Sequence, residues 1–180
     1  MKTKILFLSF LLPFFISCDE KNNNTDNESR ETLSIKGITE TDEEGNVRGA
    51  VDSDDWNLNK QFTDREKQLF STIDFTKTGI AEPITNGTQM ICFCPNPFPY
   101  MGSLYYYQNK HIVSIVIVDY KYNILHRYQF KNRKEWHLDL TTLKEGIYRM
   151  YYVMQDENEN VVHCGYGDIK RDKSVAYNAL

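Results

Sequence analysis

The chain has 180 residues, of which 41% are hydrophobic, and a formal net charge of −4, which is typical of one globular domain of ordinary size. Its 12 tyrosines and 10 phenylalanines favour half-buried strands, because aromatic side chains suit the pleated surface of a sheet. The acidic balance argues against a nucleic-acid partner, since a phosphate-binding surface is normally basic.

Residues 1–17 have the pattern of a secretory signal. Two lysines, Lys2 and Lys4, precede the run "ILFLSFLLPFFI", in which Ser9 is the one polar residue. This run of twelve residues is too short for a transmembrane helix, which needs ~20. It ends in "FISC", which resembles the lipobox of bacterial lipoproteins. The resemblance implies cleavage before Cys18 and acylation of its thiol and new amino terminus.

Lipidation of Cys18 predicts a membrane partner without a spanning helix. Each buried methylene contributes roughly 0.8 kcal/mol, so two or three acyl chains hold a protein stably on a bilayer. We therefore expect the protein at the outer membrane, lipid-anchored, on the cell surface or on the periplasmic face. A cleaved signal with an incidental cysteine is the alternative.

We expect residues 18–55 to form a disordered acidic tether. The stretch "DEKNNNTDNESRET" after Cys18 has no aromatic or aliphatic residue, so it has too little apolar surface to offset the entropy of ordering. Asp52, Asp54 and Asp55 cluster at the end of this region and suggest calcium. They lack the ligand spacing of a standard calcium loop, so we favour a solvated acidic loop and predict no metal.

Residues 56–83 are expected to hold one short helix and a connecting segment. Thr63 and Glu66 have the spacing of a capping box, and an apolar face that includes Phe70 follows them. Trp56 is the expected packing anchor for this segment.

Residues 84–170 are expected to form an all-β, Ig-like antiparallel β-sandwich of about seven strands, followed by a tail at 171–180. Seven runs rich in β-branched or aromatic residues are separated by turn-forming residues. Within the third run, "IVSIVIV" at 112–118 is apolar on both faces except for Ser114 and is expected to be a central strand. The runs are 88–94, 103–108, 111–120, 123–130, 135–140, 146–155 and 161–169.

Three segments of this half carry a resemblance to a known Ig-like module. They are "CPNPFP" at 94–99, "VSIVIVDYKYNIL" at 113–125 and "LTTLKEGIYRMYYV" at 140–153. Their order and spacing resemble the C-terminal sorting domain of type IX secretion cargo and the related domain of the flagellar hook-capping protein. In that pattern Asp119 matches a hairpin aspartate, and Leu143, Gly146 and Tyr148 match a later strand motif. The resemblance implies the Ig-like sandwich, and we carry over the fold alone.

Three cysteines lie in the predicted sandwich. Cys92 and Cys94 are two apart on one strand and therefore share a face, and Cys164 lies on the last strand beside His163. A zinc site is disfavoured because the C-x-C spacing is tight and His163 and Cys164 point to opposite faces. The sequence leaves open a disulfide from Cys164 to one of the pair, or three buried free thiols. We expect no cofactor.

No catalytic constellation is evident, so we expect a non-enzymatic protein with a binding or assembly role. His126 and His137 are the one histidine pair expected to meet, across a hairpin, and such pairs are usually solvent-exposed. Two alternatives are a thiol-dependent accessory enzyme using Cys92 and Cys94, and a structural subunit that assembles by strand exchange.

Four tyrosines in "YMGSLYYYQ" form the best candidate binding patch. Alternation along a strand sends Tyr105 and Tyr107 to the face opposite Tyr106, and Tyr100 precedes the same strand. Partly exposed tyrosines suit contacts with a protein or a polysaccharide, which is the partner we expect besides the membrane. Core and edge packing is the alternative explanation of these side chains.

Overall fold

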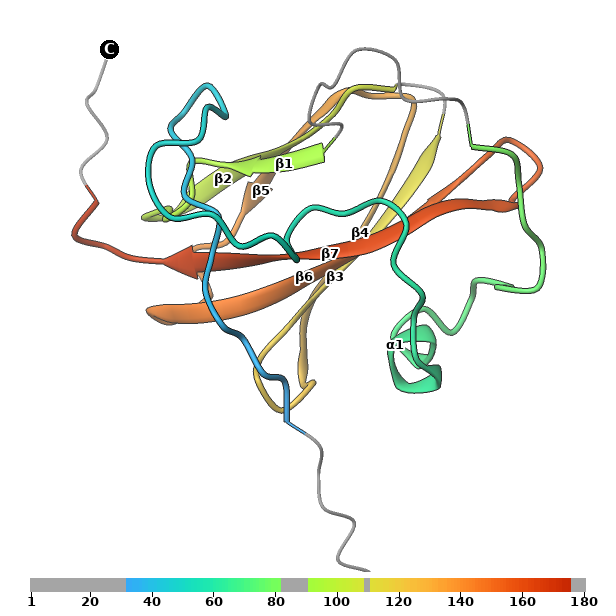
Figure 1. The fold of residues 1–180 in the computed structure, drawn as a ribbon, viewed down its shortest axis with the longest axis horizontal. Helices are drawn as coiled ribbons and strands as arrows, with labels where there is room; N and C mark the ends of the chain where they lie inside the picture. Colours follow the sequence, from blue (N-terminus) through green and yellow to red (C-terminus); the bar gives the residue numbers. More distant parts are fainter. Residues whose placement is uncertain (1–31, 82–90, 109–110, 176–180) are drawn as a thin grey trace, which may run out of the picture. The chain divides into compact units, whose positions relative to one another are not determined.

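A computed structural model describes residues 32–81, 91–108 and 111–175. The predicted signal, Cys18 and the end of the predicted tail lie outside the described residues. Within these residues, one helix and seven strands follow one another along the chain, and Figure 1 shows their arrangement. They are α1 (Asp64–Gln68), β1 (Ile91–Cys94), β2 (Met101–Tyr106), β3 (Ile112–Val118), β4 (Ile124–Lys131), β5 (Glu135–Asp139), β6 (Gly146–Gln155) and β7 (Val161–Arg171).

The strands form two antiparallel sheets that pack face to face. One sheet has the order β1-β2-β5 and the other the order β4-β3-β6-β7. The prediction of an antiparallel β-sandwich is confirmed, and each predicted run overlaps one strand. The prediction of a central strand is also confirmed, since β3 pairs with β4 on one side and with β6 on the other.

The main core lies between the two sheets. On β5, Trp136 and Leu138 are buried while the residues between them are exposed, which is the alternation expected of a strand with one solvated face. Leu104 on β2 lies beside Trp136 in the same sheet, and Ile115 and Ile117 reach the same core from β3 in the opposite sheet.

A second core lies on the outer face of the four-stranded sheet, where α1 covers it (Figure 1). The capping box is confirmed: the backbone N–H of Glu66 donates to Thr63 Oγ1 at 3.3 Å, and the N–H of Thr63 donates to Glu66 Oε2 at 2.8 Å. Phe62 precedes the cap and contacts Phe70 and the ring of Tyr151 on β6. The short helix is therefore fixed at both its first turn and its apolar face.

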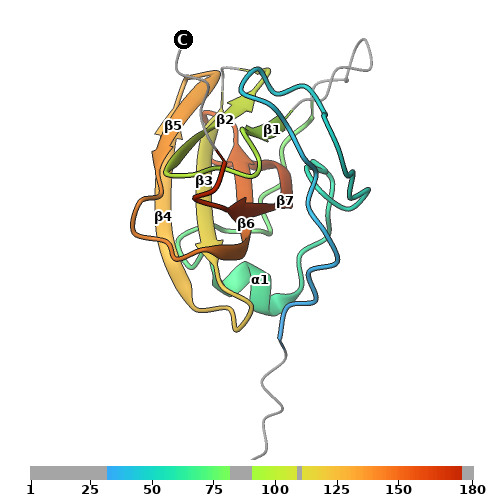
Figure 2. The same cartoon turned by 90° about the vertical axis from the view of Figure 1, so that its left-hand side faces the viewer.

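The expectation of a disordered tether is wrong for residues 32–55, which belong to the folded body. Leu33 and Ile38 are buried, and Thr39 is 3% exposed. We call residues 32–60 the strap, and Figure 2 shows it in blue to teal, passing beside β7. The strap has few apolar residues, and it is held mainly by polar contacts that its composition does not reveal.

Irregular segments cover the outer edge of β7. The N–H of Trp56 donates to Tyr166 O at 2.8 Å, and Lys60 and Leu58 exchange backbone bonds with Cys164. Lys77 and Gly79 pair with Val161 at one end of the strand, and Phe98 pairs with residues 170–172 at the other. An uncovered edge would leave a row of unpaired N–H and C=O groups, so these segments protect the sheet from unwanted pairing.

Two glycines of β7 make room for the strap. A Cβ on Gly167 would lie 2.4 Å from the indole of Trp56, and one on Gly165 would lie 1.7 Å from Asn57 O. Trp56 is 5% exposed and stacks 6.2 Å from the ring of Tyr152. The prediction that Trp56 anchors its segment is confirmed, and the motif "GYG" is explained by close packing.

Among the described turns, three share a D-x-x-x-N sequence and the same hydrogen bonds. At 156–160, Asp156 Oδ1 accepts from the N–H groups of Asn158 and Asn160, both at 2.9 Å. The turns at 42–46 and 119–123 repeat this arrangement. In each, the residue before the asparagine has a positive φ: Gly45 at 81°, Tyr122 at 63° and Glu159 at 63°.

Replacing Gly167 by alanine should lower the free energy of unfolding by about 2 kcal/mol or more, because the new methyl group would overlap the Trp56 ring. Thermal unfolding followed by circular dichroism measures the loss. Gly37→Ala is the matched control, since its Cβ would lie 3.8 Å from Asp52 Oδ2, an ordinary contact. A Gly167→Ala protein as stable as the control would contradict the close approach of Trp56.

Replacing Glu159 by glycine should raise the free energy of unfolding by about 0.5 kcal/mol, because glycine adopts a positive φ without strain. The side chain of Glu159 is exposed, and Gln155 Nε2 donates to its backbone carbonyl, which glycine keeps. Urea unfolding checks the gain. Glu157→Gly in the same turn, where φ is not positive, should show no gain, and equal effects at both positions would refute the explanation.

Candidate functional site: a carboxylate cluster beside β7

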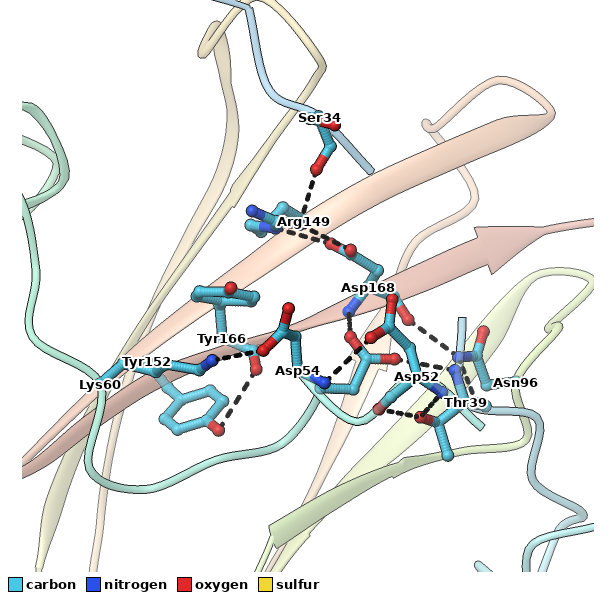
Figure 3. Close-up of polar contacts among 11 residues, drawn as sticks. Ser34, Thr39, Asp52, Asp54, Lys60, Asn96, Arg149, Tyr152, Tyr166 and Asp168 are labelled. Carbon is cyan, nitrogen blue, oxygen red and sulfur yellow. Dashed lines mark hydrogen bonds and ion pairs between the residues drawn. The ribbon is translucent and has the colours of Figure 1, made fainter. Parts of the chain in front are cut away.

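A buried ion pair joins β6 to β7 at the centre of a polar network (Figure 3). Arg149 donates from Nε and Nη2 to the two carboxylate oxygens of Asp168, each at 2.7 Å. The residues are 9% and 1% exposed. Burial opposes the charge of Arg149, but the bonds to Asp168 raise its pKa above the usual value. Burial also raises the pKa of Asp168, and the guanidinium offsets part of that shift.

Asp55 connects the strap to β7. Its Oδ1 accepts from the backbone N–H of Asp168 at 2.8 Å, and its Oδ2 accepts from the N–H of Thr39 at 2.7 Å. Burial, with a smaller contribution from the charge of Asp168, raises the pKa of Asp55 to about 6, although the two N–H groups oppose this shift. Asp55 is therefore a carboxylate held in place at some electrostatic cost.

Asn96 brings the loop after β1 into the same network. It is fully buried, and its Nδ2 donates to the carbonyls of Thr39 and Asp168, both at 2.9 Å. Its Oδ1 accepts from the N–H of Lys170, and its backbone exchanges two bonds with Thr41. One amide side chain thus joins three segments and leaves none of its donors unpaired.

Asp54 and its partner Lys60 lie on the solvent side of this network. Lys60 Nζ donates to Asp54 Oδ1 at 3.0 Å, and this bond lowers the pKa of Asp54. Lys60 also lies over the ring of Tyr166, with Nζ 5.1 Å from the centroid, while the guanidinium of Arg149 lies 4.1 Å from it. The ring of Tyr166 therefore contacts two cations, one buried and one at the surface.

Of the three aspartates singled out in the sequence, the structure gathers two with a third from β7. Carboxylate oxygens of Asp52, Asp55 and Asp168 lie within 4.8 Å of one another, while Asp54 turns to Lys60. Oxygen clusters of this kind suit hard cations. Here Asp168 is already neutralised by Arg149, and Asp55 accepts two backbone bonds. We therefore interpret the cluster as a clasp that holds the strap on β7.

The three cysteines within the described residues lie on opposite outer faces of the sandwich and are free thiols. Cys92 and Cys94 face the turn at Gly45, whose Cβ would lie 3.2 and 3.7 Å from the two sulfurs. Cys164 lies in the second core, and its Sγ donates to Lys60 O at 2.9 Å. The disulfide considered between Cys164 and Cys92 or Cys94 is not formed, because the four-stranded sheet and the main core separate them.

The thiols lack the surroundings of a reactive nucleophile. The bond with Cys92, burial and the charges of Glu135 and Asp42 raise the pKa of Cys94, and the bond with Cys94 lowers that of Cys92. Burial raises the pKa of Cys164 to about 11. Carboxylates disfavour a thiolate at Cys94 and Cys164, and the lowered pKa of Cys92 comes from its neighbouring thiol, whereas catalytic cysteines sit beside cations or helix N-termini.

The four tyrosines do not form one patch. Tyr106 is 1% exposed and belongs to the main core, so its inclusion in a binding patch is wrong. Tyr105 donates to Glu135 Oε1 at 2.6 Å. Tyr100 and Tyr107 are exposed but stand at opposite ends of β2, because the intervening strand runs between them.

The histidine pair expected across a hairpin is also separated. His126 is on β4 and His137 on β5, and these strands belong to different sheets. His126 Nε2 lies 3.0 Å from Thr142 Oγ1, and His137 Nδ1 lies 2.7 Å from Ser103 Oγ. A short connection between strands can join two sheets as readily as a hairpin, and the sequence does not distinguish them.

A cleft that sequence reasoning missed lies where β3, β4 and β6 meet their connecting loops. Its volume is ≈ 580 Å³, and we call it the terminal cleft. Tyr120, Leu125 and Ile147 stand exposed around it, 53%, 39% and 41% accessible. The strap begins beside it, since the N–H of Leu33 donates to Tyr120 O at 2.8 Å. Its residues come from separate turns, which no local pattern links.

Comparison of the chain with models of known protein families, with curated proteins and with solved structures finds no match. No helix within residues 32–81, 91–108 and 111–175 is long and apolar enough to span a bilayer.

The raised pKa of Asp55 predicts a pH-dependent effect of Asp55→Asn. The folded state binds the proton more tightly than the unfolded state, so the stability that Asp55 contributes is present below pH 3.8 and falls as the pH rises towards 6. As the pH rises from 4 to 7, the free energy of unfolding of the variant should increase relative to that of the wild type by about 1–2 kcal/mol, after a discount for solvent screening. Urea unfolding at several pH values measures the difference.

Asp54→Asn is the matched control for this experiment. The pKa of Asp54 is lowered by Lys60, so its contribution is lost as the pH falls, and the trend should reverse in sign. A difference between Asp55→Asn and wild type that stays constant with pH would contradict the assignment.

Proposed function

We propose that this chain is a non-enzymatic, lipid-anchored protein of the cell envelope, with a binding or assembly role at the outer membrane. Cys18 carries the acyl chains in this proposal, and the sandwich binds a protein or a polysaccharide on the cell surface or the periplasmic face. The two parts of the proposal, anchor and binding role, have separate support.

The proposed anchor is supported by two facts taken together. The "FISC" motif ends at Cys18, and the chain enters the folded body only a few residues later, at Leu33. Leu33 is buried and bonded to Tyr120, fifteen residues after Cys18. Those fifteen residues reach at most about 50 Å when extended. Acyl chains on Cys18 would therefore hold the sandwich close to the bilayer, and no spanning helix is needed.

The binding role is favoured because the polar groups described above stabilise the fold and the two alternative functions are disfavoured. The carboxylates of the clasp are bonded to Arg149 and to backbone N–H groups of the strap and β7, so their geometry serves the fold. The thiol-dependent alternative is disfavoured because the charges of Glu135 and Asp42 oppose a thiolate at Cys94. Strand exchange along β7 is disfavoured by the segments that cover its edge.

The anchor is tested by Cys18→Ala in cells supplied with labelled palmitate. The wild-type chain should carry the label and stay with the outer-membrane fraction, and the variant should lose both, because the acyl chains have no other attachment point in this proposal. A variant that keeps label and membrane association would contradict the role of Cys18.

Proteinase treatment of the same cells then tests which face carries the sandwich. Loss of the wild-type body from intact cells would indicate the cell surface and favour an extracellular partner. Protection until the outer membrane is broken would indicate the periplasmic face and favour a partner in envelope assembly. The soluble Cys18→Ala chain serves as the control for digestion of the unanchored body.

A further inference from the structure

The terminal cleft has a surface suited to a boundary between water and lipid. Tyr120, Leu125 and Ile147 expose apolar surface, and the ammonium of Lys121 lies 5.2 Å from the ring of Tyr120. Lys144 lines the same cleft and is exposed. Tyrosine and lysine have an apolar body and a polar end, which is the combination enriched where proteins meet lipid headgroups.

The chain's path points to the occupant of this surface. The strap starts at the cleft, because Leu33 bonds to Tyr120 and Leu33 lies in the second core with Tyr122. Figures 1 and 2 both show the beginning of the strap beside the turn that joins β3 to β4. The stretch from Cys18 to Leu33 therefore joins the body at the same end as the exposed apolar side chains.

We propose that the terminal cleft docks on the lipid surface to which Cys18 is anchored. This inference rests on the proposed lipid anchor, and it names the face that the body turns to the bilayer. A short tether keeps the cleft at high effective concentration next to the lipid, so weak insertion of a few side chains suffices to orient the body. The opposite end of the sandwich then faces away from the membrane and is free for a partner.

The chain's own C-terminal residues are the competing occupant. The N–H of Lys173 donates to Glu145 Oε1 at 3.2 Å, and Glu145 lines the cleft. The segment that follows residue 175 therefore starts near this surface. The test must distinguish lipid from this segment.

The experiment tethers the chain to lipid without using its own acyl chains. Residues 18–180 with Cys18→Ala and an N-terminal hexahistidine tag bind vesicles of phosphatidylethanolamine and phosphatidylglycerol that contain a nickel-chelating lipid. Hydrogen exchange of backbone amides is measured by mass spectrometry with and without vesicles. We expect severalfold slower exchange on vesicles in residues 119–126 and 141–148, and unchanged exchange near Tyr107.

Two matched double variants make the test specific. Tyr120→Ser with Ile147→Ser removes the apolar surface of the cleft and should abolish the slowing. Tyr107→Ser with Ile80→Ser removes a more exposed pair of the same residue types at the opposite end, where β2 ends and β7 begins, and should leave the slowing intact. Circular dichroism verifies that both variants fold.

The outcomes separate this inference from the anchor itself. Slowing that is absent in the wild type, or equal in both double variants, would overturn the docking surface. Protection of the cleft without vesicles that is lost when residues 176–180 are deleted would assign the cleft to the chain's own end and overturn it as well. Because the tag replaces the acyl chains, failure of palmitate labelling at Cys18 would leave the exchange result readable.

Discussion

The edge of β7 is the constraint on which the rest of this structure depends. A strand of eleven residues at the margin of a sheet presents backbone donors and acceptors that must be paired, solvated or protected. In this protein the strap, the segment around Gly79 and the loop at Phe98 pair with it in turn. Three irregular segments of the chain thus complete this edge of the sheet.

The clasp fixes the position of the strap on β7. A buried arginine–carboxylate pair adds little net stability over a well-packed apolar pair, but loss of one partner costs about 3–5 kcal/mol. Arg149 and Asp168 therefore act mainly by specifying geometry. The N–H of Asp168 binds Asp55, its carbonyl binds Asn96, and each of these partners in turn binds Thr39. A displaced strap would leave several buried polar groups unpaired at once.

The two ends of the sandwich differ in a way that relates to the proposed function. The strap begins at the terminal cleft, where apolar and cationic side chains stand together, and its clasp lies close by on β6 and β7. The opposite end carries Tyr107, with Lys134 over its ring at 5.5 Å. A body tethered at one end and exposed at the other suits a protein that is held at a surface and contacts something beyond it.

Much of the strand pattern follows from the sequence because it depends on neighbours along the chain. The seven runs rich in β-branched or aromatic residues predicted the strands, and the spacing of Thr63 and Glu66 predicted the helix cap. The lipobox-like "FISC" is equally local, and lipidation of Cys18 stays a prediction from the sequence. The D-x-x-x-N spacing of the three turns is also local, but it does not identify them by itself, because Asp55 and Asn59 have the same spacing. Asp55 bonds instead to Thr39 and Asp168.

The clasp, the strap and the terminal cleft were decided by the tertiary structure. Asp55 and Asp168 are more than a hundred residues apart, and an acidic residue in a polar stretch looks the same whether it is solvated or bonded to a distant strand. His126 and His137 are separated because β4 and β5 belong to different sheets. Tyr106 is buried because its side of β2 faces the main core. Local sequence determined the elements, because propensity and periodicity act between near neighbours. Only the three-dimensional fold determined which polar groups meet, because that depends on pairing across the whole chain.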